Sequence, residues 1–555
     1  MSANTVRAAA DAWLAQDPDP DTRAQLEALL AAADAGDEAA LAELKAAFAG
    51  PLTFGTAGLR SSMGPGPGRM NRVVVTQAAA GFTDWLLSEG GVAPGATVLI
   101  GYDARHKSAD FARDTAEVMA AAGLKPLLTD SPIPTPVVAF GVVHLGCAAG
   151  VQVTASHNPA ADNGYKVYLG DGSQIIPPTD SQIAARIAAR AAGPLNDIPR
   201  SKTYPTIGAE LADAYVRRTA DRVSDATSHD VVWAYTAMHG VGAPVVRKVV
   251  GAAGFPAPFI VEAQVNPDPE FPTVPFPNPE EPGAMDLVIA LAQARQADIA
   301  IATDPDADRC AVAALVEGEW RRLTGDEVGA VLGDDAIHRG TPGRFANSIV
   351  SSTLLKTMAT AAGRQFETTL TGFKWIGRVP DLAFGYEEAI GYCCDPGAVR
   401  DKDGISATAV LLRLVAELKA QGLTIADRLA EIDQRFGVHA TTQHAVRVAK
   451  LSQITAMMKR LRATPPTELA GEPVTVGDLR KPSGGLPPTD GLEFTGPSVH
   501  VVVRPSGTEP KLKCYLQAIR PAEEARRNLI ASRAAAVQTL DEVWAAIDAV
   551  LRPES

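Results

Sequence analysis

A serine stands directly after an apolar run in the stretch Thr154-Ala155-Ser156-His157-Asn158-Pro159. Residues 149–153 favour a strand, so we expect Ser156 on a turn between strand and loop. A serine in that position can act as a nucleophile or carry a phosphoryl group. Composition alone is equally compatible with an ordinary turn, because Ser, His, Asn and Pro are common turn residues. The G-x-S-x-G elbow of hydrolases is not present around Ser156.

Three aspartates at alternate positions, Asp304, Asp306 and Asp308, follow another strand-like run at 299–302. Their carboxylates would repel one another without a cation, and oxygen ligands suit a hard divalent ion such as Mg²⁺. An EF-hand would need Gly at the sixth and Glu at the twelfth position, where this chain has Arg309 and Leu315. The pattern therefore predicts a metal site. The alternative, a solvated acidic turn, fits poorly with a buried strand before it.

Two basic residues lie in segments that can reach a phosphoryl group. Lys166, in the strand-like run Asn-Gly-Tyr-Lys-Val-Tyr, could return to the pocket of Ser156 and transfer a proton. Arg60 ends the segment Phe-Gly-Thr-Ala-Gly-Leu-Arg, whose glycines permit close packing. For each of them a solvated surface position is the alternative.

Two further loops carry groups suited to a phosphorylated sugar. Glu387 and Glu388 lie between glycines and could accept hydrogen bonds from vicinal hydroxyls, although an exposed turn is the commoner context for such a pair. The run 504–511, Arg-Pro-Ser-Gly-Thr-Glu-Pro-Lys, offers backbone N–H groups and a guanidinium and is a candidate phosphate nest; a plain hairpin loop is the alternative. No G-x-x-x-x-G-K-[ST] sequence is present, which excludes a P-loop nucleotide enzyme.

The elements that must position these residues alternate between strand and helix. Short strands are expected at 97–100, 151–153, 231–235, 299–302 and 348–350, with helices at 108–122, 181–192, 284–296 and 405–420. This alternation predicts α/β layers with largely parallel sheets, in which ligands bind beyond the carboxyl ends of the strands. Residues 5–48 predict two or three leading helices. The C-terminal part, with strands at 501–503 and 512–516 and a helix at 521–551, predicts a smaller α+β domain.

Composition restricts the class of protein. The chain has 555 residues, 46% hydrophobic and 21% charged, and a formal net charge of −13, which makes it a poor candidate for binding nucleic acid. Its five cysteines are odd in number and include no C-x-x-C pair, so neither a disulfide framework nor a zinc site is expected. No signal peptide and no membrane span is predicted, and the cytoplasm is the expected compartment. Residues 193–206, 266–283 and 482–498 are expected to be irregular loops.

The five motifs occur in the order found in the α-D-phosphohexomutase superfamily, and the chain resembles that family over most of its length. The carrying runs are FGTAGLR, TASHNP with NGYKVY, DPDADR, GYEEAIGY and RPSGTEPK. The chain is also similar to the branch that holds phosphopentomutase-type enzymes and related bacterial phosphoglucomutases. That likeness rests on Trp13-Leu14, Asp17-Pro18-Asp19-Pro20, GFKWIG at 372–377 and Asp401-Lys402-Asp403-Gly404.

The resemblance implies four domains around a central cleft, three related α/β units with mixed, mainly parallel sheets and a smaller C-terminal α+β domain. On this basis the expected boundaries are N-terminal helices at 1–50, a phosphoserine domain at 51–204, a metal-loop domain at 205–318, a sugar-loop domain at 319–438 and a phosphate-loop domain at 439–555.

The resemblance also implies a role for each motif. Ser156 would be the phosphoserine, and its phosphoryl oxygen would share Mg²⁺ with Asp304, Asp306 and Asp308. Arg60 and Arg309 would lie near the transferring group, with His157 and Lys166 as candidate proton donors or acceptors. The sugar and its non-reacting phosphate would be bound by Gly372, Phe373, Lys374, Glu388, Arg504, Ser506, Gly507 and Thr508.

The implied reaction interconverts hexose 1-phosphate and hexose 6-phosphate, with glucose favoured and glucose 1,6-bisphosphate, or the matching sugar bisphosphate, as activator. Mannose and a pentose are the alternative sugars. Many family members have Ser where this chain has Ile390, although the phosphopentomutase-type branch shows a similar run. Remoter alternatives are a metal-dependent sugar phosphatase and a non-catalytic phosphosugar sensor. The sequence indicates no oligomeric state.

Overall fold

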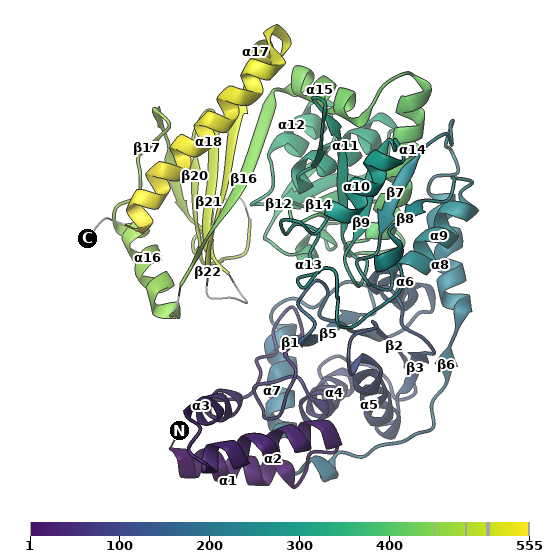
Figure 1. Cartoon of the computed structure of the whole chain (residues 1–555), viewed down its shortest axis with the longest axis vertical. Coiled ribbons are helices and arrows are strands. Elements are labelled where there is room, and N and C mark those ends of the chain that lie inside the picture. Colours follow the sequence, from purple (N-terminus) through teal and green to yellow (C-terminus); the bar gives the residue numbers. More distant parts are fainter. Residues whose placement is uncertain (1, 449, 483–484, 507–510, 553–555) are drawn as a thin grey trace. The chain divides into compact units, whose positions relative to one another are not determined.

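The computed structural model describes residues 2–448, 450–482, 485–506 and 511–552, and the chain divides into two compact units (Figure 1). The first unit holds the chain up to 313 together with 320–322 and 391–417. The second holds 314–319, 323–390 and the chain from 418 onward.

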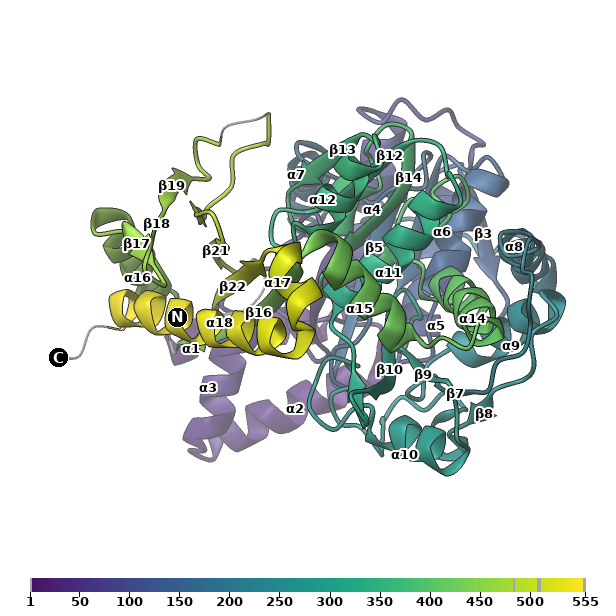
Figure 2. The same cartoon turned by 90° about the horizontal axis from the view of Figure 1, so that it is seen from above.

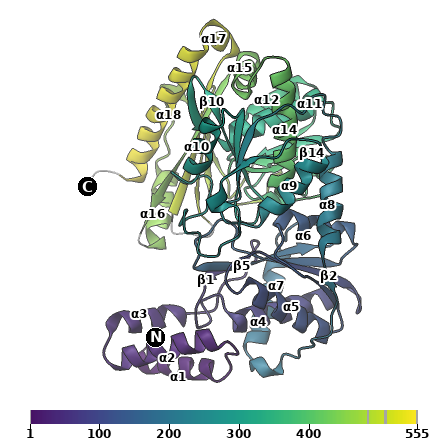
Figure 3. The same ribbon diagram turned by 45° about the vertical axis from the view of Figure 1, so that its right-hand side comes forward.

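Three helices open the first unit, where the sequence predicted two or three, and Figure 3 shows them side by side: α1 (Ala3–Leu14), α2 (Pro20–Asp34) and α3 (Glu38–Ala47). Asp19 starts α2 by accepting a hydrogen bond from the backbone N–H of Asp21, and Pro20 occupies the first helical position. Apolar side chains at helical spacing, Leu26, Leu30 and Leu44, are buried against the following domain.

The first sheet has six strands in the order β1-β5-β4-β2-β3-β6, with β2 parallel to β3 and β4, and β5 antiparallel to β4 and β1. Leu99 of β2 faces α6 (Thr135–His144), whereas its neighbours Val98 and Ile100 face the core formed with α4 (Arg72–Leu87), α5 (Ser108–Ala121) and α7 (Thr179–Ala191). The strands are β1 (Leu59–Ser62), β2 (Thr97–Tyr102), β3 (Lys125–Thr129), β4 (Ala149–Val153), β5 (Asp162–Leu169) and β6 (Thr206–Ile207).

The second sheet has the order β11-β10-β9-β7-β8, with β7 parallel to β8 and β9, and β10 antiparallel to β9. Its strands are β7 (Trp233–Thr236), β8 (Phe259–Ile260), β9 (Ile299–Thr303), β10 (Cys310–Val316) and β11 (Glu319–Arg322). The helix α8 (Ala209–Asp221) precedes these strands in the chain, and α9 (Gly242–Ala252) and α10 (Asp286–Ala294) lie between them. The first unit also includes α14 (Gly404–Ala420) as far as Glu417.

The second unit begins with another parallel arrangement, in which β12 (Arg344–Ser348) lies between β13 (Phe366–Thr369) and β14 (Leu382–Glu387). The expected strand at 348–350 was wrong: β12 ends at Ser348, and the N–H of Ser351 closes a turn onto the Ser348 carbonyl. The other elements here are α11 (Gly325–His338), α12 (Leu354–Ala361), the short α13 (Phe373–Ile376) and α15 (Ile425–Phe436), and β15 (Gly391–Cys393) follows β14 in the chain.

The C-terminal part is an antiparallel sheet in the order β16-β22-β21-β20-β19, with the long helix α18 packed along β22 and β16 (Figure 2). The expected helix at 521–551 is interrupted at Asn528, whose side chain caps α18, and the loop expected at 482–498 contains β20. The elements are β16 (Val438–Arg447), α16 (Leu451–Ala463), β17 (Glu468–Leu469), β18 (Glu472–Pro473), β19 (Thr475–Asp478), β20 (Leu492–Thr495), β21 (Val499–Pro505), β22 (Lys511–Arg520), α17 (Ala522–Arg527) and α18 (Leu529–Leu551).

The predicted fold class is therefore confirmed: mixed, mainly parallel sheets precede an antiparallel C-terminal domain. All five cysteines are buried and unpaired. Among the described residues, no helix is both long and apolar enough to cross a membrane.

Candidate active site

Ser156 lies on the turn that follows β4, and its side chain is fixed on both sides. Its backbone takes the left-handed conformation (φ 54°), and its N–H donates to Thr154 Oγ1 over 2.9 Å. The hydroxyl Oγ donates to Asp304 Oδ2 over 2.8 Å. Only 2% of the residue is exposed, so the hydroxyl is directed into the protein and not to bulk water.

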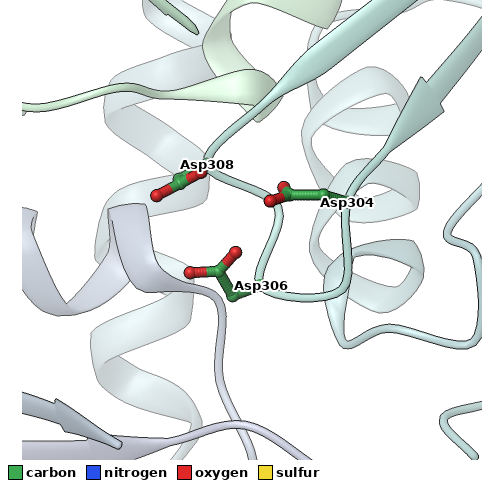
Figure 4. Close-up of side chains that lie close together, drawn as sticks. All are labelled: Asp304, Asp306 and Asp308. Carbon is green, nitrogen blue, oxygen red and sulfur yellow. The ribbon is translucent and has the colours of Figure 1, made fainter. Parts of the chain in front are cut away.

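The three aspartates of the predicted metal loop converge after β9. Asp304, Asp306 and Asp308 are each 0% exposed, and one carboxylate oxygen from each lies within 4.8 Å of the others. Figure 4 shows the three side chains reaching into a common space from one turn of the chain. The backbone N–H of Arg309 donates to Asp304 Oδ1 over 3.0 Å, which ties the end of the loop to its beginning.

Lys166 reaches this cluster from β5 and is the main positive charge against it. Its Nζ donates to Asp306 Oδ2 over 2.6 Å and to Asp308 Oδ2 over 2.7 Å, with 7% of its side chain exposed. Lys402 adds a second ammonium, 3.5 Å from Asp308 Oδ2. The sequence-based expectation that Lys166 returns to the pocket of Ser156 agrees with this placement.

Burial and mutual repulsion control protonation in the cluster. Burial, reinforced by Asp306 and Asp308, raises the pKa of Asp304 well above its ordinary value, and burial likewise raises the pKa of Asp308. Burial acts in the same direction on Asp306, but the ammonium of Lys166 outweighs it and lowers the pKa of Asp306. The site thus favours either a proton or a further cation beside Asp304.

The oxygen atoms that face the cluster fit a hard divalent cation. Asp306 Oδ1 and Asp308 Oδ1 are buried and have no hydrogen-bond partner within the described part of the chain. An unpaired buried carboxylate oxygen is costly, and coordination by an ion such as Mg²⁺ removes that cost. Ser156 Oγ, through its contact with Asp304, lies at the edge of the same oxygen set.

The remaining predicted catalytic residues surround the serine turn. Arg60 of β1 donates from Nη1 to Asn158 Oδ1 over 3.1 Å, and Arg309 Nη1 lies 3.8 Å from Asp304 Oδ2. The Nδ1 atom of His157 lies 3.4 Å from Ser156 Oγ. The structure thus brings all the predicted catalytic and metal-binding residues together within the first unit.

Glu388, in the second unit, is held by two serines, one at the end of β12 and one in the turn that follows it. Its Oε2 accepts hydrogen bonds from Ser348 Oγ and Ser351 Oγ, each 3.0 Å long. Burial, followed by the charge of Asp326, raises the pKa of Glu388. A Cβ at Gly325 would lie 1.9 Å from the Glu388 carbonyl oxygen, so only glycine permits this close approach.

The other predicted sugar-loop residues differ in accessibility. Phe373 is buried at 3% exposure and contributes to the core, whereas Lys374 is half-buried. Gly372 before them has φ 103°, a conformation that favours glycine. Ile390, two residues after Glu388, is fully buried and left-handed (φ 54°), so its side chain belongs to the interior.

The predicted phosphate loop begins at the end of β21. Arg504 is half-buried beside the hydroxyl of Tyr515, and the backbone N–H of Ser506 donates to the Lys511 carbonyl over 2.9 Å, which joins the two ends of the loop. Gly507 and Thr508 lie outside the described residues.

Comparison with known proteins finds four domains of one family, in order along the chain. Phosphoglucomutase/phosphomannomutase alpha/beta/alpha domains I, II and III match residues 51–193, 213–316 and 324–436, and the C-terminal domain of the same family matches 444–531. The chain belongs to the phosphoglucomutase/phosphomannomutase family. It is therefore an isomerase of the phosphohexomutase type.

Relatives in this family carry different sugar names. The chain is 47% identical to a probable phosphomannomutase of Haemophilus influenzae over 81% of this chain and 93% of that protein. It is 36% identical to a probable phosphoribomutase of Schizosaccharomyces pombe, over 91% and 92%, and 33% identical to a phosphoglucomutase of Staphylococcus aureus, over 85% and 91%. A putative phosphomannomutase structure from Thermus thermophilus superposes with a TM-score of 0.67 at 26% identity, over 88% of this chain and 99% of that one.

Sequence reasoning missed several residues that this phosphohexomutase places around the site. Thr135 donates from Oγ1 to Asp306 Oδ2 over 2.5 Å, and nothing in its local sequence indicates this role. Lys402 was named from the sequence only as part of the run Asp401-Lys402-Asp403-Gly404, with no role in the site. A lysine between two aspartates is nevertheless a signal for an ion-paired cluster. Arg105, two residues after Asp103 at the end of a strand, offered the same kind of signal.

Proposed function

We propose that this phosphohexomutase interconverts hexose 1-phosphate and hexose 6-phosphate, with glucose as the preferred sugar, through a phosphoserine at Ser156. The observation that carries the proposal is the 2.8 Å hydrogen bond from Ser156 Oγ to Asp304 inside a buried aspartate cluster that also holds Lys166. A hydroxyl in such a place is suited to carrying a phosphoryl group, because cations and carboxylates already surround it.

The reaction proposed consists of two transfers. In the first, the bond from phosphorus to Ser156 Oγ breaks and a bond to the free sugar hydroxyl forms, and the hydroxyl proton ends on Oγ. The product is a sugar 1,6-bisphosphate, which reorients before its other phosphoryl group returns to Oγ. His157, 3.4 Å from Oγ, and Lys166, hydrogen-bonded to Asp306, are the candidates that move the proton.

Asp304, Asp306 and Asp308 would hold Mg²⁺ together with the oxygen of Ser156 or its phosphoryl group. Among the described residues, Asp306 Oδ1 and Asp308 Oδ1 have no hydrogen-bond partner, which supports this donor set. The ion, when bound, neutralises charge on the transferring phosphoryl group. Arg60 and Arg309 would assist from the rim of the same turn.

In the second unit, Glu388 would accept hydrogen bonds from sugar hydroxyls. These bonds would replace those from Ser348 and Ser351 or be added to them. Gly372, Phe373 and Lys374 would form a second sugar-binding loop. Arg504, Ser506, Gly507 and Thr508 would bind the phosphate that is not reacting, and glucose 1,6-bisphosphate would prime the enzyme. The relatives are named for mannose, ribose and glucose, so the preferred sugar has to be measured. After glucose, mannose is our second choice and a pentose the third.

Intact-mass measurement tests the covalent step. Protein treated with glucose 1,6-bisphosphate should gain about 80 Da, the mass of one phosphoryl group, and Ser156→Ala should gain nothing and lose turnover. An active enzyme without the adduct, or a fully active Ser156→Ala variant, would refute the phosphoserine.

A panel of the 1-phosphates of glucose, mannose, ribose and deoxyribose, each with its bisphosphate, tests the sugar. The specificity constant should be highest for glucose 1-phosphate, and a higher value for another sugar reassigns the substrate. Release of inorganic phosphate at the rate of substrate loss would instead show a phosphatase.

A further inference from the structure

The side chain of Arg105 lies beneath the turn that carries Ser156 and binds it through four backbone carbonyls. Nη2 donates to the carbonyl oxygens of Ser156 and Asn158, each over 2.6 Å. Nη1 donates to those of Pro159 over 2.8 Å and Asp162 over 3.2 Å. One guanidinium therefore closes the whole loop from Ser156 to the start of β5.

Arg105 is itself held rigidly. Its side chain is 1% exposed, its Nε lies 3.3 Å from Asp103 Oδ2, and its backbone N–H donates to Asp103 Oδ1 over 3.0 Å. The ring of Phe271 covers the guanidinium, with the carbon atom Cζ 4.9 Å from the ring centroid. Asp103 and Phe271 thus fix the orientation of the Arg105 guanidinium independently of its contacts with the serine loop.

Two physical features make this contact important for the serine. Four carbonyl oxygens that converge on one point repel one another unless a multiple donor lies between them. The left-handed conformation at Ser156 (φ 54°) is also unfavourable for a residue with a Cβ. Arg105 supplies four donors in a plane, which a lysine ammonium cannot match because its three donors radiate from one atom.

We propose that Arg105 is a positioning residue for phosphoryl transfer: it holds Ser156 in the left-handed turn that points Oγ at Asp304. It touches the backbone of the loop and no reacting atom. The proposal rests on the proposed role of Ser156 as phosphoryl carrier, and it adds a residue whose loss should affect the transfer step more than sugar binding.

The test compares Arg105→Lys with Arg413→Lys in the full chain. Arg413 is a matched control, because it is also fully buried in the first unit but pairs with Asp225. With glucose 1-phosphate and glucose 1,6-bisphosphate, Arg105→Lys should lower kcat by about 10- to 100-fold, the effect expected of a misplaced reacting group. KM should stay within about threefold, since the residues proposed to bind the sugar belong to the second unit.

A second measurement separates positioning from general damage to the fold. In Arg105→Ala, guanidinium ion at millimolar, non-denaturing concentration should restore part of kcat and of the rate at which Ser156 gains its phosphoryl mass; it should not affect Arg413→Ala. If Arg105→Ala does not fold, the lysine variant decides. Equal kcat in Arg105→Lys and Arg413→Lys would overturn the proposal, as would a loss seen only in KM.

The phosphoryl mass distinguishes an error in the function of Ser156 from an error in the role of Arg105. If the wild-type protein is active but never gains the phosphoryl mass, the proposed function of Ser156 is wrong. If the wild type gains it and Arg105→Lys gains it at the same rate, only the role of Arg105 is wrong.

Discussion

The ammonium of Lys166 lies 2.6 Å from Asp306 Oδ2, although 140 residues separate the two in the chain. Both groups are buried, so the pair is not a surface ion pair screened by water. It joins the first sheet to the metal loop of the second, and it offsets part of the negative charge of three clustered carboxylates. The stability of the first unit should therefore depend on Lys166.

Replacement of Lys166 by Gln should lower the free energy of unfolding by about 3–5 kcal/mol in EDTA, because it removes the nearer of two ammonium groups from buried carboxylates. Lys248→Gln is the control, since its pair with Asp213 is half exposed on both sides and should cost less than about 1 kcal/mol. Urea denaturation of both variants measures the difference. Equal losses would show that the Lys166 pair contributes no more than a surface contact.

Asp306→Asn should remove the response of the protein to Mg²⁺. The wild-type melting temperature should rise on addition of millimolar MgCl₂ over EDTA, because an ion that binds only the folded state stabilises it, and the variant should show little of that rise. Asp286→Asn, on the exposed first turn of α10, is the matched control. An Asp306→Asn protein that keeps the full magnesium shift and magnesium-dependent activity would remove Asp306 from the ligand set.

Gly404→Ala should be far more harmful than an ordinary glycine substitution. A Cβ at Gly404 would lie 2.2 Å from the carbonyl oxygen of Arg309, so the added methyl must displace the end of the metal loop. Overpacking of this kind costs about 1–3 kcal/mol, and activity should fall with it. Gly251→Ala in α9, where no atom of the described residues lies within 4 Å of the added Cβ, should be neutral or slightly stabilising. Thermal unfolding and turnover of the two variants check the contrast.

The contribution of Asp403 to the free energy of unfolding should decrease as pH rises from about 4 to 6. Burial raises the pKa of Asp403 to about 6 in the folded protein, above the ordinary value of about 4 for an unfolded chain. The folded state therefore binds the proton more strongly, and this contribution is complete below the unfolded pKa and lost as pH passes the folded one.

Asp403→Asn cannot ionise, so its stability relative to wild type should improve by up to about 3 kcal/mol between pH 4 and pH 7, at about 1.4 kcal/mol per pKa unit. Asn can still accept the hydrogen bonds from Tyr215 and from the backbone of Ser406 at the start of α14. Urea midpoints at several pH values test this. Parallel pH profiles for the two proteins would contradict the raised pKa.

Glu388→Gln should weaken use of the sugar without unfolding the protein. Its carboxylate accepts from Ser348 and Ser351, and an amide with one acceptor oxygen should lower the specificity constant by about 10- to 100-fold, since a hydrogen bond to a charged group contributes about 1.5–3 kcal/mol. Glu367→Gln, whose carboxylate pairs with Arg344 at the surface, serves as control. Unchanged specificity constants for all hexose phosphates would argue against a sugar contact at Glu388.

Local sequence patterns are enough to predict the candidate site loops and the class of fold. Ser156, the three aspartates and Glu388 all follow strands, and such short-range patterns depend only on neighbouring residues. The same local rules located the N-terminal helices and the parallel strands β2, β4, β7 and β9, but they predicted no strand at β3, β8, β13 or β14. They misplaced β12 and missed the break at Asn528, because strand and helix ends are decided by contacts with distant residues.

Which of these loops meet depends on contacts between distant parts of the chain. The antiparallel register of β4 and β5 places Gln152 opposite Lys166, and this pairing sets Lys166 beside the serine turn. Arg105 and Thr135 follow the parallel strands β2 and β3, which end at the same edge of the first sheet. No local sequence pattern encodes their contacts with the site. The spacing of residues within one motif is fixed by the covalent chain. The pairing of distant strands depends on how their side chains pack together in a common core, and that core exists only in the folded chain.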